Sequence, residues 1–428
     1  MSSSNSVSTL RGLTGLSPVL VFLLLYLVVS LVTGDFYAMP FPVALLAASV
    51  WGVLICRGPL TERIEIFSRA AGHSNIIYMI WVFILAGAFA AIAEAIGAVD
   101  ATVALTLRLM QASLVVPGMF VAACLVSLAV GTSVGTVVAL TPLAVSLAGA
   151  AGDNVPFMVA VVLGGAFFGD NLSFISDTTL AATRTQGCDM ADKFRANAAI
   201  VLPAAVVTLA LYVIHYTDTA LGAPVPDASP WLALPYAIVI AAALARLNVN
   251  LVLTLGIASA LIAGLAGGHS LMEMCGYMGE GIGSMGALIV VTLMSAGMLG
   301  LVEACGGIRW LLGVLTARVS SRRGGAMCIG ILVSLVNMCT ANNTVAIITV
   351  GPLARDIAAR FGIEPRRSAS LLDTCSCIVQ CLIPYGAQTL LATSLAGISP
   401  AAPFGSLYYP WALAGAVVVS IVLMRGRR

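Results

Sequence analysis

Long apolar segments recur along this sequence, and they constrain its fold more than any other feature. A helix of about 20 mostly apolar residues is long enough to cross a bilayer. Within lipid, every backbone N–H and C=O must find a partner inside the protein, which limits spanning structures to helices and closed barrels. Only 9% of the residues are charged, whereas soluble domains have about 25%. We therefore predict an all-α polytopic membrane protein.

About ten segments have the length and apolar character of full spans. They lie near residues 17–33, 40–56, 75–98, 154–184, 196–216, 231–246, 249–267, 286–304, 368–393 and 407–424. Two further segments, 117–150 and 325–354, are apolar but broken in the middle by GTSVGT and TANNTV. The first would form about 50 Å of helix, short of two crossings of about 30 Å. We therefore predict that each broken segment is a re-entrant hairpin.

The two halves of the sequence resemble each other after a shift of about 210 positions, which indicates an internal repeat. TPLA at 141–144 falls on GPLA at 351–354, and TTLAAT at 178–183 falls on QTLLAT at 388–393. Glu94 faces Glu303 within one residue. Each half would have five spans, and this odd number inverts the second half relative to the first. We predict two inverted-topology repeats, at residues 1–222 and 228–428.

Each predicted repeat has the same parts in the same order: a helical region, an amphipathic arm along one membrane surface, a hairpin, a broken helix and a final helix. In the first repeat these are 17–98, 99–116, 117–150, 154–184 and 196–216. In the second they are 231–304, 307–323, 325–354, 368–393 and 407–424. Each arm could instead extend the preceding helix into solvent.

The basic residues predict the orientation, because cytoplasmic loops are enriched in Lys and Arg. With the N-terminus inside, nearly all basic residues fall inside, among them Lys193, Arg322 and Arg323, and Arg108 is the exception. The acidic Glu273 and Glu280 fall outside. We therefore expect a multi-pass protein of a bacterial cytoplasmic membrane, with both termini in the cytoplasm.

The stretch GDNLSFISDTT, residues 169–179, places two carboxylates between apolar runs. Irregular backbone at membrane depth occurs where it is buried in protein or lines a wet cavity, and ionisable residues in spans are usually functional. We expect a site near the midplane, where the hairpin tips and the broken helices meet. Its candidate residues are Asp170, Asp177 and Asp373, then Thr132, Ser133, Thr136, Thr340, Asn342, Asn343 and Thr344 at the hairpin tips, and Gln380, Gln388 and Thr389 in the second broken helix.

Carboxylates and freed carbonyls suit a small hard cation, and helix N-termini suit an anionic group. Asp170 and Asp177 have neutral Gln380 and Gln388 near the equivalent places, and we expect no Lys or Arg in either core. This asymmetry favours a cation that competes with protons for the same oxygens, which is sufficient for antiport. The carboxylates could instead be structural, with Asp170 capping a half-helix and Asp177 bonded to a hydroxyl. Glu94 and Glu303 could be interfacial residues or a proton path.

Other classes fit less well. The sequence has no nucleophile–base or metal-ligand pattern, so we expect neither an enzyme nor a resident cofactor. It has no clustered basic face, so we expect no nucleic-acid partner. An uncoupled channel would not need the repeat. A cation-coupled transporter of a small organic or amino acid remains the alternative to cation/proton exchange.

Three stretches resemble the NhaC-type Na⁺/H⁺ antiporters of the ion transporter superfamily: GTSVGTVVALTPLAV, GDNLSFISDTT and SASLLDTCSCIVQCLIPYGAQTLLA. The chain looks like a shorter, divergent branch, with Phe174 where a proline is usual. The resemblance implies exchange of Na⁺ for H⁺, a homodimer, and an elevator in which a transport domain moves against the scaffold helices 17–98 and 231–304. It also implies that Asp170, Asn171, Ser173, Asp177 and Thr178 carry the signature role. Relatives of this type include malate/lactate exchangers, so a small carboxylated solute stays possible.

Overall fold

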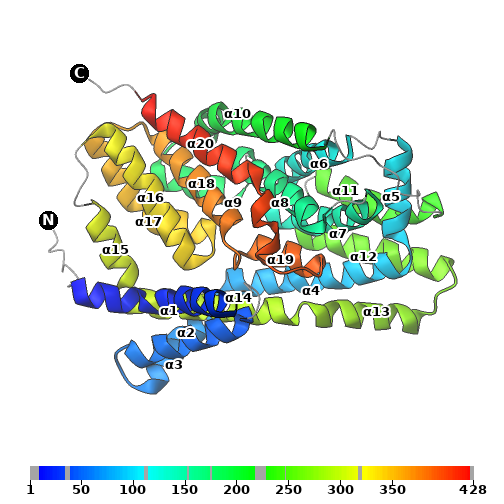
Figure 1. The fold of residues 1–428 in the computed structure, drawn as a ribbon, viewed down its shortest axis with the longest axis horizontal. Coiled ribbons are helices and arrows are strands. Elements are labelled where there is room, and N and C mark those ends of the chain that lie inside the picture. The colour runs from blue at the N-terminus through cyan, green and yellow to red at the C-terminus, as the bar shows by residue number, and fades with distance from the viewer. Residues whose placement is uncertain are drawn as a thin grey trace.

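The computed structural model describes residues 9–33, 39–109, 114–151, 154–173, 176–216, 228–245, 247–316 and 321–424. All regular structure within these residues is helical (Figure 1), as the apolar segments predict. Seven described helices are long and apolar enough to cross a bilayer. Two of these candidates, Val155–Gln186 and Pro365–Leu395, include the predicted breaks.

The helices up to the centre of the chain are α1 (Thr9–Thr33), α2 (Phe41–Ile55), α3 (Leu60–Ala71), α4 (Ser74–Ala95), α5 (Ala98–Leu109), α6 (Val115–Val130), α7 (Ser133–Ala151), α8 (Val155–Leu172), α9 (Asp177–Gln186) and α10 (Met190–Tyr216). The rest are α11 (Leu234–Leu244), α12 (Val249–Ala266), α13 (Leu271–Ser284), α14 (Gly286–Ala304), α15 (Gly307–Thr316), α16 (Arg322–Thr340), α17 (Asn343–Phe361), α18 (Pro365–Leu382), α19 (Ala387–Leu395) and α20 (Tyr408–Val422). Two short 3₁₀ helices precede α11 and α20.

The two predicted hairpins are the helix pairs α6–α7 and α16–α17, each with a tight turn at its tip. The first turns at Gly131 (φ 76°), where the lack of a Cβ permits the left-handed conformation. The second turns at Ala341 (φ 47°), the one non-glycine residue with positive φ in the described part of the chain. Asn342 then accepts the backbone N–H of Val345 and caps α17. Both turns bring a helix C-terminus and a helix N-terminus to one point.

Close packing against α6 positions the first broken helix. A Cβ added at Gly169 would overlap Ser127 of α6, and one added at Gly165 would overlap Ala123. Glycines four residues apart therefore let the two backbones approach, as in small-residue packing of membrane helices. Ser127 Oγ donates to Ala166 O at 2.5 Å across this contact. This contact fixes the position of Asp170, the residue after Gly169, relative to α6.

Two helices occur where the sequence predicted connections. Residues 271–284 form α13, which leads directly into α14, although Glu273 and Glu280 were expected in a segment outside the membrane. The glycines and carboxylates of this stretch lower its apolar content, which hid the helix. Residues 60–71 form α3, whose polar face includes Arg63 and Arg69.

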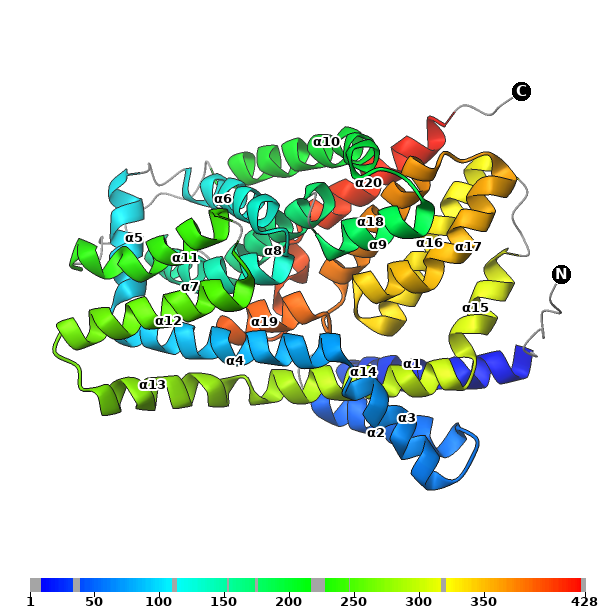
Figure 2. The same cartoon turned by 180° about the vertical axis from the view of Figure 1, so that it is seen from behind.

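The two views show how the helices run relative to the long axis and where the two terminal helices lie. In Figures 1 and 2, α4, α12, α13 and α14 follow the long axis, whereas α5 and α15 cross it at opposite ends. The start of α1 and the end of α20 lie at the same end. The inverted repeat, the two arms and the re-entrant character of the hairpins remain predictions.

Candidate functional site

The hairpin tips and helix breaks surround one cavity of about 130 Å³. Ten of the residues proposed from the sequence line it: Thr132, Ser133, Asp170, Asp177, Thr178, Asn342, Asn343, Thr344, Gln380 and Gln388. The sequence did not single out Ser176, nor Tyr78 and Met79 of α4, which also line the cavity. Ser176 was visible within the polar stretch, whereas nothing local to α4 marks Tyr78. No Lys, Arg or His is among the described residues that line the cavity.

Asp170 lies in the last turn of α8 and faces the N-terminus of α7. Its carboxylate accepts the backbone N–H of Ser133 at 3.0 Å and the Ser133 hydroxyl at 2.5 Å. The N-terminal end of α7 thus stabilises negative charge on Asp170. A carboxylate offers about four lone-pair positions, so Asp170 keeps acceptor capacity for a ligand in the cavity.

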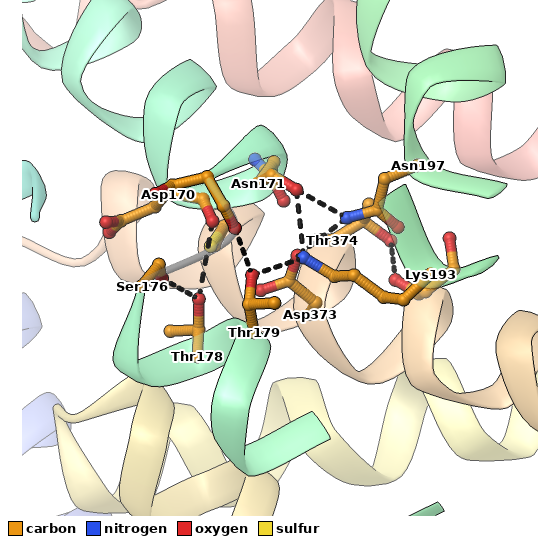
Figure 3. Close-up of polar contacts among 12 residues, drawn as sticks. Asp170, Asn171, Ser176, Thr178, Thr179, Lys193, Asn197, Asp373 and Thr374 are labelled. Atoms are coloured by element: carbon orange, nitrogen blue, oxygen red, sulfur yellow. Dashed lines mark hydrogen bonds and ion pairs between the residues drawn. The ribbon is translucent and has the colours of Figure 1, made fainter. Parts of the chain in front are cut away.

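Asp177 begins α9 on the other side of the same break, and its side chain is exposed in the cavity. No hydrogen bond or ion pair within the described residues uses its carboxylate. Beside it, Thr178 Oγ1 lies 2.7 Å from Ser176 Oγ and 3.5 Å from the Asp170 carbonyl oxygen (Figure 3). The break therefore presents two carboxylates and nearby hydroxyls to one small space.

A chain of hydrogen bonds leads from Asp170 to the tip of the second hairpin. Ser133 Oγ accepts from Gln388 Nε2 at 3.0 Å, and Gln388 Oε1 accepts from Gln380 Nε2 at 3.0 Å. Gln380 Nε2 also donates to the carbonyl of Ala341 at 2.9 Å. This chain, which we call the glutamine relay, links the first broken helix to both hairpins and to the second broken helix.

A basic residue lies in the core, so the expectation that neither core contains Lys or Arg is wrong. Lys193 is 1% exposed, and its Nζ lies 2.6 Å from Asp373 Oδ2. It also donates to Thr179 Oγ1 at 2.7 Å and to the carbonyl of Asn171 at 2.9 Å (Figure 3). Lys193 is not cytoplasmic-surface charge, because α10 already starts at Met190 and turns this residue inward.

Asn197 lies one turn after Lys193 on the same face of α10. It donates to the carbonyl of Asn171 and to Asp373 Oδ2, both at 2.7 Å. Asp192 and Arg195 occupy the opposite, exposed face and pair with each other. The spacing of Lys193 and Asn197 by four residues, before an apolar run, was the signal in the sequence that could have identified this inward face.

Asp373 does not line the cavity. It is fully buried in α18, and its Oδ2 is engaged by Lys193 and Asn197. A buried ion pair needs further hydrogen bonds; Asn197 supplies one to Asp373 Oδ2, and Thr179 and the Asn171 carbonyl accept from Lys193, whereas Asp373 Oδ1 has no hydrogen-bond partner among the described residues. The cluster joins the break between α8 and α9 to α10 and α18, so Asp373 acts here on the position of these helices.

The remaining candidates lie away from the cavity lining. Asn171 donates to the Phe167 carbonyl at 2.8 Å and to Tyr409 OH at 3.3 Å. Ser173 and Thr389 are buried, and the hydroxyls of Thr136 and Thr340 bond to backbone carbonyls of their own hairpins. Glu94 lines a different cavity with Asp100 and Glu280, and Glu303 is exposed near the end of α14. The structure does not bring these two glutamates to the site.

Comparison with known proteins agrees with a transporter. The family described as "Na+/H+ antiporter family" matches residues 18–216 and 222–425. The malate-2H⁺/Na⁺-lactate antiporter of Bacillus subtilis is 20% identical over 386 residues, which cover 82% of this chain and 81% of the relative. The Na⁺/H⁺ antiporter NhaC of the same organism is 23% identical over 308 residues, which cover 64% and 68%.

Among solved structures, the YdaH transporter of Alcanivorax borkumensis aligns with a TM-score of 0.43 and 16% identity, covering 94% of this chain and 97% of that one. The family match extends over nearly the whole chain, and it includes both hairpins and both broken helices. This chain therefore belongs to the Na⁺/H⁺ antiporter family and is a multi-pass membrane transporter.

Proposed function

We propose that the protein exchanges Na⁺ for H⁺ by alternating access, with Asp170 and Asp177 as the shared site for cation and protons. One observation carries this proposal: the two carboxylates come from opposite sides of one helix break and line the same cavity, which has no basic side chain among its described lining residues. Oxygen atoms of this kind are the ligands that hard cations prefer. Thr178, Ser176 and the hairpin tips supply the neutral oxygens.

Competition between Na⁺ and H⁺ follows from this arrangement. Two carboxylates that share a small cavity repel each other, so the site favours either a cation or a proton over the empty, doubly charged state. A carrier that crosses only when its site is occupied then exchanges one ion for the other.

The moving part would be an elevator-type transport domain built from the hairpins and broken helices. The order of elements supports an inverted repeat, because a helix pair, a broken helix and a final helix occur in α6–α10 and again in α16–α20. Lys193 bonds to Asp373 in the second broken helix and to Asn171 and Thr179 in the first. The glutamine relay reaches Asp170 through Ser133. These links between the two broken helices suit a unit that moves as one body. We further propose a homodimer in a bacterial cytoplasmic membrane with both termini cytoplasmic, which the shared end of α1 and α20 supports.

The alternative is a cation-coupled exchanger of a small carboxylated solute or amino acid. The observation that favours it is that four helix N-termini line the cavity, at Ser133, Asp177, Asn343 and Ala387. Helix N-termini attract anionic groups. At α7 the Asp170 carboxylate already takes this place, and the others could receive a solute carboxylate. One relative exchanges malate and lactate, according to its name.

The test uses purified protein in liposomes with a trapped pH dye and an imposed pH gradient. We expect Na⁺ alone to collapse the gradient, and we expect Asp177→Asn to abolish the response. Asp189→Asn is the matched control, because Asp189 is an exposed carboxylate between α9 and α10. A folded protein that ignores Na⁺ alone but responds when malate or lactate is added would replace the first function with the alternative.

A further inference from the structure

A groove of about 650 Å³ lies between α10, α18 and α20, outside the transport site. Along most of its length it is apolar, with Ile200, Pro203 and Val207 on α10 facing Val419 on α20. Val207 is 50% exposed and Val419 is 55% exposed. Because α10 is a candidate span, this part of the groove would lie at the depth of lipid acyl chains.

One end of the groove is basic. Arg195, Arg366 and Arg367 line it; Arg366 and Arg367 come from the first turn of α18, and Arg195 from the second turn of α10. Arg195 pairs with Asp192 at 3.4 Å, and Arg366 pairs through Nε with Glu364 at 2.6 Å. Arg367 has no ion pair within the described residues. Two helix N-termini add partial positive charge at the same end.

The carboxylate of Glu364 reports this positive environment. Its pKa lies below the usual value, because Arg366 donates a hydrogen bond to it and because Arg367 and Arg322 add positive charge nearby. Glu364 is the N-cap residue of α18, without a side-chain capping hydrogen bond, and it does not line the groove. The basic end therefore keeps a surplus of cationic groups toward the groove.

A buried hydroxyl at this end has no partner. Ser370 is 2% exposed and lines the groove one turn after Arg366, yet its Oγ makes no hydrogen bond. A serine within a helix usually bonds back to the carbonyl four residues earlier or points into water. A buried polar group without a partner costs roughly 1–3 kcal/mol. A ligand oxygen in the groove would remove this cost.

We propose that this groove binds an anionic phospholipid, whose phosphate lies between Arg195, Arg366 and Arg367. The Ser370 hydroxyl donates to an oxygen of the phosphate or of the glycerol ester. An acyl chain then lies along α10 and α20. A lipid is the one occupant that supplies both an anionic head and an apolar tail of this length, and basic pockets between membrane helices are suited to such headgroups. A second copy of this chain would need to present an acidic group at the arginines.

The test is lipid binding by the full-length protein in mild detergent, measured by native mass spectrometry. The probes are dioleoyl phosphatidylglycerol and, as the neutral comparison, dioleoyl phosphatidylcholine. We expect tighter binding of phosphatidylglycerol, and we expect Arg366→Gln with Arg367→Gln to lower its affinity about 30-fold. Ser370→Ala should lower the affinity for phosphatidylglycerol about threefold to tenfold, because it removes the hydroxyl that donates a hydrogen bond to the lipid.

The control pair is Arg57→Gln with Arg69→Gln, which removes the same charge at exposed positions far from the groove in sequence. This pair should keep the affinity of the unchanged protein. Equal binding of the two lipids, or full affinity after loss of Arg366 and Arg367, would overturn the proposal. The proposal would also be overturned if Val207→Trp converted a dimer to a monomer and left the lipid affinity unchanged. That result would mean that a second copy of the chain, and not a lipid, covers the groove. None of these measurements of lipid affinity or oligomeric state requires transport activity.

Discussion

Lys193 and Asp373 form an ion pair in the interior, with Nζ 2.6 Å from Oδ2 and with side chains that are 1% and 0% exposed. The residues are far apart in sequence and belong to the two predicted repeats. Their contact, together with the bond that Asn197 donates to Asp373 and the bond that Lys193 donates to Thr179, joins α10 and α18 behind the first helix break. The site cavity lies on the other side of this break. One buried basic side chain, Lys193, thus connects the helices next to a cavity that has no basic side chain among its described lining residues.

Lys193→Met should strongly destabilise the protein. The change leaves the buried Asp373 carboxylate without its counter-ion, which typically costs about 3–5 kcal/mol. Thermal unfolding in detergent would measure the effect. Lys193→Met with Asp373→Leu should recover much of the loss, because both charges are then absent. Arg195→Gln breaks an exposed pair and should change stability by less than about 1 kcal/mol. A single variant as stable as the unchanged protein would contradict the structural role.

Proton competition at Asp170 and Asp177 predicts that the apparent KM for Na⁺ depends on pH. Below the range in which the site loses its proton, each unit of falling pH should raise this KM by up to about tenfold for one shared proton. At higher pH the KM should become constant, because protons no longer occupy the site. Initial rates of Na⁺-driven proton movement in liposomes, taken over several pH values, would measure this. A KM that is independent of pH would exclude a shared site.

Gln380→Leu should slow exchange without unfolding the protein. It removes the donor that the glutamine relay uses to reach both Gln388 and the carbonyl of Ala341. The buried Gln388 Oε1 then lacks a partner, at roughly 1–3 kcal/mol, the half-buried Ala341 carbonyl loses its donor, and the second hairpin tip loses its link to Asp170. We expect a rate decrease of about tenfold or more. Thr344→Val is the control, since Thr344 lines the same cavity without a side-chain hydrogen bond among the described residues. Equal rates for the two variants would argue against the relay.

Gly169→Ala should displace α8 from α6 and shift Asp170. The added Cβ would overlap Ser127, and overpacking of this kind costs about 1–3 kcal/mol. Both the unfolding temperature and the exchange rate should fall. Gly149→Ala in α7 meets nothing within 4 Å, so it should be neutral or stabilise by up to about 1 kcal/mol through helix propensity. A Gly169→Ala protein that behaves like Gly149→Ala would show that the close approach of α6 and α8 is not needed.

Much of the fold was accessible from the sequence, because lipid restricts both the hydropathy and the backbone of a spanning segment. The apolar runs predicted the helical class, and the polar interruptions predicted the tips at Gly131 and Ala341 and the break before Asp177. The helix at 271–284 was not predicted, because its glycines and carboxylates are typical of a connecting segment. Local composition therefore determines where helices are interrupted more reliably than where a weakly apolar helix occurs.

The sequence by itself determined where polar residues interrupt the apolar segments, and only the tertiary structure decided which of these residues share a space. Asp170, Asp177 and the hairpin residues meet at one cavity, whereas Asp373 from the same list lies behind it with Lys193. The bond from Gln388 to Ser133 joins residues 255 positions apart. Such a contact depends on how two helix breaks and two hairpin tips pack together. Hydropathy and spacing act within one segment, and they carry no information about which segments from the two halves come into contact.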